Sequence, residues 1–456
     1  MKAFTKLLIL VGFFFSYYAS SFEEVSDTLK NVIGKNKINL VETKSANTGD
    51  GLGFYFISDN QFHNFLGDPQ LLRNKVADKV VVVAIRPPRL DLFAPDMLEH
   101  TIRMQGKDKF AIHLGDATNI ACQNEWEKFV QRMRPTQMGE RVSKGWVMVP
   151  GNHDFYFLGN TAGHHWMKSR GMKKIWAKAC NDSSYPAKVP KNLRENIIVK
   201  DDFVRLYLKE LIKQSTIPEI GKNFPFDTRD AKCKKSKVAT KLGLTEPSTK
   251  FKSCEWKSKD PKSFLQRVHY KLPLKKDLRV AYRALLIQEV NLNPPGSKPF
   301  HYKGVLLDTQ DYFINPSIAS SSIFGKVAKY FGKVNPGENG AVQKRQGDIV
   351  KRWIKENNKI HKKENIVYVF MGHHPYELLL YLSKARLNGI FNNVRYHMYV
   401  SSHTHFGWIK KHKTVSELNV GSVTDWGTLG SQTVYLQKAK IKRSNREGGG
   451  PPDIKI

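Results

Sequence analysis

The sequence is poor in acidic residues relative to basic ones. Its 456 residues contain 41 Asp and Glu against 74 Lys and Arg, which gives a formal net charge of +33. A charge of this size surrounds the protein with a positive field, so we expect an anionic partner. A phosphorylated substrate, nucleic acid, phospholipid and lipopolysaccharide all fit this expectation. The alternative explanation is a source proteome that is basic throughout.

Long apolar runs are lacking everywhere except at the N-terminus. There, Lys2 and Lys6 precede the apolar run 7–15 and the small residues 19–21, which is the layout of a secretory signal peptide. The run is about half of the roughly 20 residues that cross a bilayer, so an uncleaved anchor is the weaker alternative. We therefore expect residues 1–21 to be removed. The mature protein is then secreted or periplasmic and has no transmembrane helix.

Cysteine is scarce and widely spaced, which excludes a zinc ribbon. In an oxidising compartment an even number of cysteines is consistent with two disulfides, and free buried thiols are the alternative. Two cysteines flank one lysine-rich loop and are the preferred pair, which leaves the other two for each other. Four cysteines allow three pairings, and the sequence alone does not choose among them. The preferred pairs are Cys233 with Cys254 and Cys122 with Cys180.

The length of the chain is ample for a large hydrophobic core. We expect a linker over 22–53 and a folded domain over 54–435, with a lysine-rich insertion at about 155–278. The glycine- and proline-containing segment 436–456 is expected to be a basic, disordered tail. The sequence shows no internal repeat.

Short apolar runs alternate with helical patterns along the domain. Because strands in such α/β folds end at one common crevice, the polar residues that follow the runs should lie close together. Strands are predicted over 54–58, 79–85, 110–114, 146–149, 282–290, 304–307, 366–371 and 397–400, and helices over 95–104 and 346–356.

Five polar blocks, in order along the chain, come directly after predicted strands. Each block is a weak signal alone, because a Gly-Asp pair or a single histidine is common in any long chain. Their shared placement at strand ends makes the set specific. The blocks are Ser58-Asp59-Asn60-Gln61-Phe62-His63, Gly115-Asp116, Gly151-Asn152-His153-Asp154, Gly372-His373-His374-Pro375 and Ser402-His403-Thr404-His405.

This ordered set resembles the calcineurin-like metallophosphoesterase superfamily, with a ligand pattern similar to that of purple acid phosphatases. The family pattern is D-x-H, GD, GNH(D/E), a later GH and a final GHxH. The resemblance covers about 54–159 and 285–427 and leaves the lysine-rich insertion unmatched. It implies a four-layer α/β/β/α metallophosphoesterase sandwich that hydrolyses phosphate mono- or diesters.

The resemblance also implies a site for two metal ions, Mn, Fe or Zn. Two adjacent ions need hard oxygen donors and neutral imidazoles, with one carboxylate shared between them. Asp116 is the natural bridging ligand. One ion would take Asp59, Asp116, His405 and a further ligand from the loop of Asp59, while the other takes Asp116, Asn152, His373 and His403.

The implied reaction is attack on phosphorus by a hydroxide that bridges the two metals. His153 would serve as proton donor or phosphate clamp, and Asp154 would orient its ring. His374 is expected behind the ligands, with a solvent-facing structural role as the alternative.

The chain departs from the family pattern at one ligand. Asp59 is followed two residues later by Gln61 rather than by histidine, and the next histidine is His63. In a strand, residues i and i+2 lie on the same side, so Gln61 is the preferred ligand and His63 would need a bulged loop. An amide oxygen in place of an imidazole predicts weaker binding or a harder metal at this position.

A non-catalytic protein of the same fold, which binds anionic surfaces or nucleic acid through its charge, is the competing hypothesis. The presence of Asn152 and His153 argues against it. Lysines without regularly interleaved aromatic residues indicate only non-specific electrostatic binding.

Overall fold

The structure is a computed structural model. The chain divides into the compact units Met1–Gly49 and Asp50–Ile456, and all the residues described below belong to the second unit. The predicted signal peptide, linker and tail, and the predicted strand over 79–85, lie outside the described residues. These comprise residues 54–62, 94–105, 110–119, 121–133, 145–155, 198, 200–216, 232–235, 251–257, 265–273, 285–292, 301–311, 339–361 and 365–423.

Within these ranges, the smaller of two sheets has three parallel strands in the order β1-β2-β3. They are β1 (Phe54–Ile57), β2 (Phe110–His113) and β3 (Trp146–Met148), and every residue in them is buried. Burial of both faces explains why these segments are continuous apolar runs in the sequence rather than alternating patterns. The three strands predicted here are confirmed to within one residue at either end.

Over the part of the chain that the structure describes, the larger sheet has nine strands in the order β11-β12-β10-β9-β8-β7-β6-β5-β4. Pairing is parallel from β12 to β8 and antiparallel elsewhere, so the fold is α/β with one parallel and one mixed sheet. The strands are β4 (Lys232–Lys235), β5 (Phe251–Lys257), β6 (Leu265–Pro273), β7 (Leu285–Asn291), β8 (His301–Leu306), β9 (Ile366–Met371), β10 (Tyr396–Ser401), β11 (Trp408–Lys411) and β12 (Ser416–Asn419).

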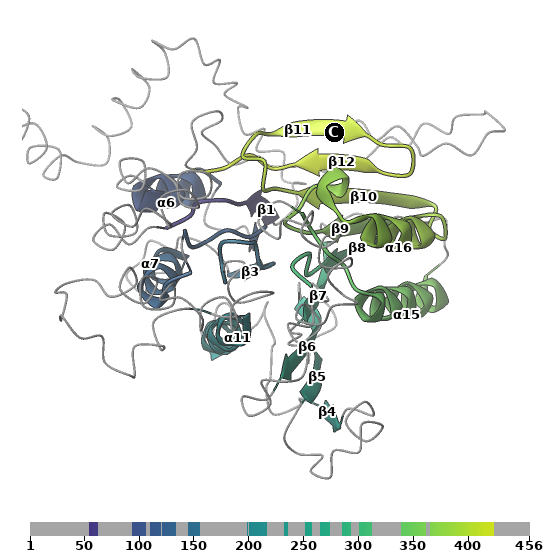
Figure 1. The fold of residues 1–456 in the computed structure, drawn as a ribbon, viewed down its shortest axis with the longest axis horizontal. Helices are drawn as coiled ribbons and strands as arrows, with labels where there is room; N and C mark the ends of the chain where they lie inside the picture. The colour runs from purple at the N-terminus through teal and green to yellow at the C-terminus, as the bar shows by residue number, and fades with distance from the viewer. Residues whose placement is uncertain are drawn as a thin grey trace, which may run out of the picture. The chain divides into compact units, whose positions relative to one another are not determined.

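Two hydrophobic clusters occupy opposite faces of the larger sheet, because successive side chains of a strand alternate. Along β9, Val367 and Val369 join a cluster that includes the smaller sheet, α6, α7 and α11, whereas Tyr368 and Phe370 join one that includes α15 and α16. Helices α15 and α16 contact each other beside this sheet (Figure 1). The helices are α6 (Ala94–Gln105), α7 (Gln123–Met133), α11 (Lys200–Thr216), α15 (Lys344–Ile360) and α16 (Tyr381–Phe391).

The outer edge of β3 is closed by side chains. The backbone N–H of Trp146 donates to Gln214 Oε1 at 2.9 Å, and that of Met148 donates to Tyr207 Oη at 2.8 Å. Gln288 of β7 in turn donates to the Met148 carbonyl. A buried strand edge needs partners for its backbone groups, and two residues of α11 and one of β7 supply them here.

The segment predicted as a lysine-rich insertion contributes directly to this fold. Phe203 and Tyr207 of α11 are buried in the core, where their rings contact those of Trp126 and Trp146 respectively. Strands β4, β5 and β6 of the same segment extend the larger sheet. The lysine-rich composition gave no indication of either role.

Cys233 and Cys254 lie opposite each other as Cα partners in β4 and β5. The buried Cys122 is disulfide-bonded. Cys180 lies outside the described residues, so both preferred pairs stay predictions. Among the helices that are described, none combines the length and the hydrophobicity needed to cross a membrane.

Candidate metal centre

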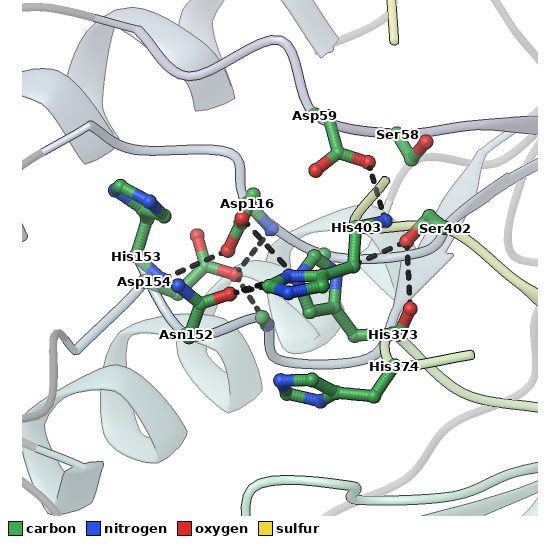
Figure 2. A network of polar contacts seen from close by, with 12 residues as sticks. Ser58, Asp59, Asp116, Asn152, His153, Asp154, His373, His374, Ser402 and His403 are labelled. Carbon is green, nitrogen blue, oxygen red and sulfur yellow. Dashed lines mark hydrogen bonds and ion pairs between the residues drawn. The ribbon is translucent and has the colours of Figure 1, made fainter. Parts of the chain in front are cut away.

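The predicted ligands gather just beyond the carboxyl ends of strands from both sheets, as expected for parallel strands in α/β folds. Figure 2 shows most of them in one network of polar contacts. The set comprises Asp59 after β1, Asp116 after β2, Asn152 after β3, His373 after β9, and His403 and His405 after β10.

The ligand loops have an unusual backbone. A positive φ occurs at Asp59 (51°), Gln61 (39°), Asp116 (59°), His403 (75°) and His405 (64°). Residues other than glycine seldom adopt this conformation, and such strain concentrates at functional sites. The i and i+2 ligand pairs were predicted from strand geometry, but the structure presents them from left-handed turns that follow the strands.

Glycine is required where the loops of Asp116 and Asn152 meet. Gly115 has a φ of +100°, and a Cβ atom there would lie 2.7 Å from the Gly151 nitrogen and 2.8 Å from His373 Nδ1. Any larger residue would separate these loops, so the Gly-Asp pair of the sequence serves close packing as well as ligation.

Asp116 lies between two groups of predicted ligands. Its Oδ2 atom is 3.2 Å from His373 Nε2 and 3.4 Å from Gln61 Nε2. Its Oδ1 atom accepts the backbone N–H of His153 at 2.8 Å. This is the position that a carboxylate shared by two ions requires.

The donor atoms of Asn152, His373 and His403 already converge. Asn152 Oδ1 is 2.9 Å from His373 Nε2 and 3.0 Å from His403 Nδ1, and the two nitrogens are 3.0 Å apart. Ligand atoms bound about 2.1 Å from one ion are about 3.0 Å apart in octahedral and about 3.4 Å apart in tetrahedral coordination, so small shifts would fit this group to a metal. The Nδ1 of His373 contacts the Leu114 carbonyl at 2.8 Å, which directs Nε2 toward the ligands.

The second group forms around Asp59. Its Oδ1 atom is 3.4 Å from Nε2 of His405, whose side chain is 22% exposed, and its Oδ2 atom accepts the His403 N–H at 3.2 Å. Gln61 is buried, and its Oε1 has no hydrogen-bond partner although its Nε2 faces Asp116. A buried acceptor without a partner is costly, which fits an amide whose partner is a cation. His63 lies outside the described residues.

The carboxylates draw positive charge into the site. Burial opposes the ionisation of Asp59, but His405 and His373 outweigh it and lower its pKa to about 2. Burial also opposes the cation of His373, yet Asp116 and Asp59 raise its pKa to about 9. Burial and the charge of His373 lower the pKa of His403 to about 3. The negative charge of Asp116 and Asp59 that raises the pKa of His373 would also attract a metal ion, which must displace that proton in order to bind.

Asp154 does not perform the role predicted for it. Its carboxylate accepts four backbone N–H bonds of 2.8 to 3.2 Å from Asp116, Ala117, Thr118 and Gly151. It therefore fixes the loop of Asp116 to the loop of Asn152. Burial, together with the charge of Asp116, raises its pKa to about 7.

The ring of His153 is held instead by the carbonyl of Asn119, 2.6 Å from its Nδ1. In Figure 2 this ring points away from the pair His373 and His403. A backbone carbonyl across the loop leaves no signal in the sequence, which explains why the orienting group was assigned to the adjacent carboxylate.

His374 lies behind the ligands and is fully buried, which excludes the solvent-facing alternative. Its Nδ1 is 2.9 Å from Thr309 Oγ1, its Nε2 is 3.1 Å from Gln310 Nε2, and its ring centroid is 4.6 Å from that of His403. The sequence analysis did not identify Thr309 and Gln310 as part of the site. The available signal was their position directly after the strand that ends at Leu306.

Among the described residues, two groups of Asp and His side chains could hold a metal ion, because their ligand atoms lie within 4.8 Å of one another. One is Asp59, Asp116 and His373, and the other is His373, His374 and His403. The donor types and the partnerless Gln61 oxygen fit the predicted metals.

Comparison with known proteins gives little further information. No family model and no curated protein matches the chain. Among solved structures, the chain is similar to the crystal structure of phosphopantetheinyl hydrolase (PptH) from Mycobacterium tuberculosis. The identity is 12%, the TM-score is 0.26, and the match covers 82% of this chain and 91% of that chain. A likeness at this TM-score carries no argument about function.

Proposed function

We propose that the chain is an exported hydrolase of phosphate mono- or diesters that works with two metal ions. The observation that carries the proposal is the position of Asp116 Oδ2, between His373 Nε2 at 3.2 Å and Gln61 Nε2 at 3.4 Å. A carboxylate placed between two groups of oxygen and imidazole donors is what two neighbouring ions require as their shared ligand.

The two groups divide the ligands between two positions, which we name the Asp59 position and the His373 position. The Asp59 position would use the carboxylate of Asp59, the Oε1 of Gln61 and the Nε2 of His405. The His373 position would use the Oδ1 of Asn152, the Nε2 of His373 and the Nδ1 of His403, and both positions share Asp116.

When bound, the ions would activate water for in-line attack and neutralise charge on the phosphoryl oxygens. The residues of the chain hold this arrangement in place, since Asp154 joins the ligand loops through four backbone amides. The Asn119 carbonyl can only accept, so Nδ1 of His153 carries a proton, and Nε2 would donate a second proton to the leaving oxygen from the doubly protonated ring.

The layer order α/β/β/α is part of the proposal. One hydrophobic cluster contains residues of both sheets and of α6, α7 and α11, and the other contains the opposite face of the larger sheet with α15 and α16. An order of helices, small sheet, large sheet and helices would account for both clusters. Secretion and an anionic substrate, supported by the N-terminal run and the charge of +33, complete the proposal.

The test is a hydrolysis assay of the purified mature protein. An aryl phosphomonoester and an aryl phosphodiester would be supplied with Mn²⁺, Zn²⁺, Fe²⁺ or a chelator. We expect metal-dependent release of the aryl alcohol from at least one ester, abolished by the chelator and by Asp116→Ala. Thermal unfolding of Asp116→Ala would establish that the variant is folded.

Failure of every metal with both esters would contradict the proposal. Retention of binding to anionic polymers by such an inactive protein would instead support the non-catalytic alternative. A nuclease would be recognised by cleavage of DNA that weakens steeply as salt is raised.

A further inference from the structure

The two metal positions differ in their donor chemistry. Apart from the shared Asp116, the His373 position has two imidazoles and one amide oxygen, whereas the Asp59 position has one carboxylate, one imidazole and the Gln61 amide. Imidazole-rich sites suit zinc and iron, while carboxylate and carbonyl oxygens suit magnesium and manganese. The positions are therefore not equivalent for any one ion.

The two metal positions also differ in the distances between their donor atoms. At the His373 position, three donor atoms are within 3.0 Å of one another. At the Asp59 position, Asp59 Oδ1 and His405 Nε2 are 3.4 Å apart, and His405 is 22% exposed. An ion there must order a partly exposed side chain, which costs free energy.

The side-chain amide of Gln61 must also reorient before its oxygen can bind an ion. Its amide turns Nε2, not Oε1, toward Asp116 at 3.4 Å, and the buried Oε1 has no partner. A half-turn of the amide about its last side-chain bond would exchange the two atoms and present the oxygen to the shared ion. Ion binding then breaks the contact with Asp116 but satisfies the partnerless oxygen.

We infer that Gln61 makes the two positions unequal. The His373 position binds one borderline ion such as Zn²⁺ tightly, and the Asp59 position binds a harder ion such as Mn²⁺ weakly, through the Gln61 oxygen. This inference rests on the proposed function. It implies a protein that carries one ion through purification and acquires the second only from millimolar metal or together with substrate.

The experiment measures metal binding rather than activity. The protein is stripped with chelator and titrated with Zn²⁺ and then with Mn²⁺, with the bound ions counted by elemental analysis and the affinities measured by calorimetry. We expect one tight Zn²⁺ and a Mn²⁺ site at least about tenfold weaker, the size of effect that a supporting ligand has on metal affinity.

Three variants test whether Gln61 causes the difference in metal affinity between the two positions. Gln61→Ala should lose the weak site and keep the tight one. Gln61→His should bind a second Zn²⁺ more tightly by about tenfold, because it supplies an imidazole and histidine tolerates the φ of 39° at this position. Gln123→His adds the same residue at the start of α7, where the side chain of Gln123 contacts Glu127 and none of the predicted ligands, and should change neither site.

Two equal tight sites in the wild type would overturn the inference and leave the proposed function standing. Loss of the weak site in His63→Ala but not in Gln61→Ala would overturn it as well. Absence of any bound ion in the folded wild-type protein would instead contradict the proposed function itself.

Discussion

His113 connects the two loops that carry the carboxylate ligands. Its Nδ1 accepts the backbone N–H of Gly115 at 3.1 Å, and its Nε2 is 2.5 Å from Asn60 Oδ1. Gly115 precedes Asp116, and Asn60 follows Asp59. An imidazole that accepts at one nitrogen and donates at the other is neutral, so the site depends on an uncharged histidine.

This requirement predicts a pH dependence of stability. Burial lowers the pKa of His113 from 6.5 to about 3. Below the unfolded pKa, the unfolded chain gains a proton that the folded chain lacks. The contribution of His113 is therefore present above about pH 6.5 and is lost as the pH falls toward 3, at up to about 1.4 kcal/mol per pH unit.

Urea unfolding between about pH 4 and 6 checks this sign, with His113→Gln as the comparison because glutamine offers hydrogen bonds but does not titrate. The variant should lose stability less steeply on acidification than the wild type. Equal slopes would mean that His113 is not the neutral group inferred here.

At this scale, the sequence predicted which residue types make the site but not how they are held. Carboxylate, amide and imidazole at strand ends are visible as motifs. The positive φ of Asp59 and Asp116, and the bond from Asn119 to His153, arise from contacts between loops distant in the chain. Nothing in the local pattern encodes such contacts.

Helix α11 contributes the lysine of a buried ion pair that lies behind the ligands. Lys200, its first residue, is 2.6 Å from Asp308, and both side chains are fully buried. Lys200 also donates to the Gln310 carbonyl at 2.7 Å, and Asp308 accepts the Gln310 N–H at 3.0 Å. The side chain of Gln310 contacts His374, so the pair fixes the loop behind the ligands.

Removal of one charge should be more damaging than removal of both. Lys200→Met leaves Asp308 buried without its cation, and we expect a loss of about 3 to 5 kcal/mol in the free energy of unfolding. The double variant Lys200→Met, Asp308→Asn should be more stable than the sum of the single effects predicts. A double-mutant cycle by urea unfolding measures this coupling, and additive effects would argue against it.

Elements were predictable where their residues are buried throughout. The runs that form β1 and β9 fit this description, and so does β10 apart from its first residue. Helix α16 was not predicted, since Tyr381 and Leu382 at its start are 80% and 62% exposed and obscure its buried face. Strand β11 is largely exposed and basic, and β4 to β6 lie in the lysine-rich segment. Their composition is typical of solvent-exposed loops, so it did not predict strands of a sheet.

The charge of the whole molecule predicts binding to anionic surfaces. The full chain carries a net charge of +33, and the mature protein, which loses only Lys2 and Lys6 of its charged residues, should sediment with vesicles that contain phosphatidylglycerol at low salt. It should be released at about 1 M salt, where the Debye length is about 3 Å. Vesicles of phosphatidylcholine alone are the control. Equal binding to both, or binding that salt does not weaken, would contradict an electrostatic origin.

The closed edge of β3 limits how the molecule can associate with other chains. A strand whose outer backbone groups already bond to Gln214, Tyr207 and Gln288 cannot recruit a strand from a neighbouring copy. Protection by neutral side chains is not screened by salt, unlike protection by lysines. Truncation of Tyr207 and Gln214 would leave the buried N–H groups of Met148 and Trp146 without acceptors and lower the free energy of unfolding.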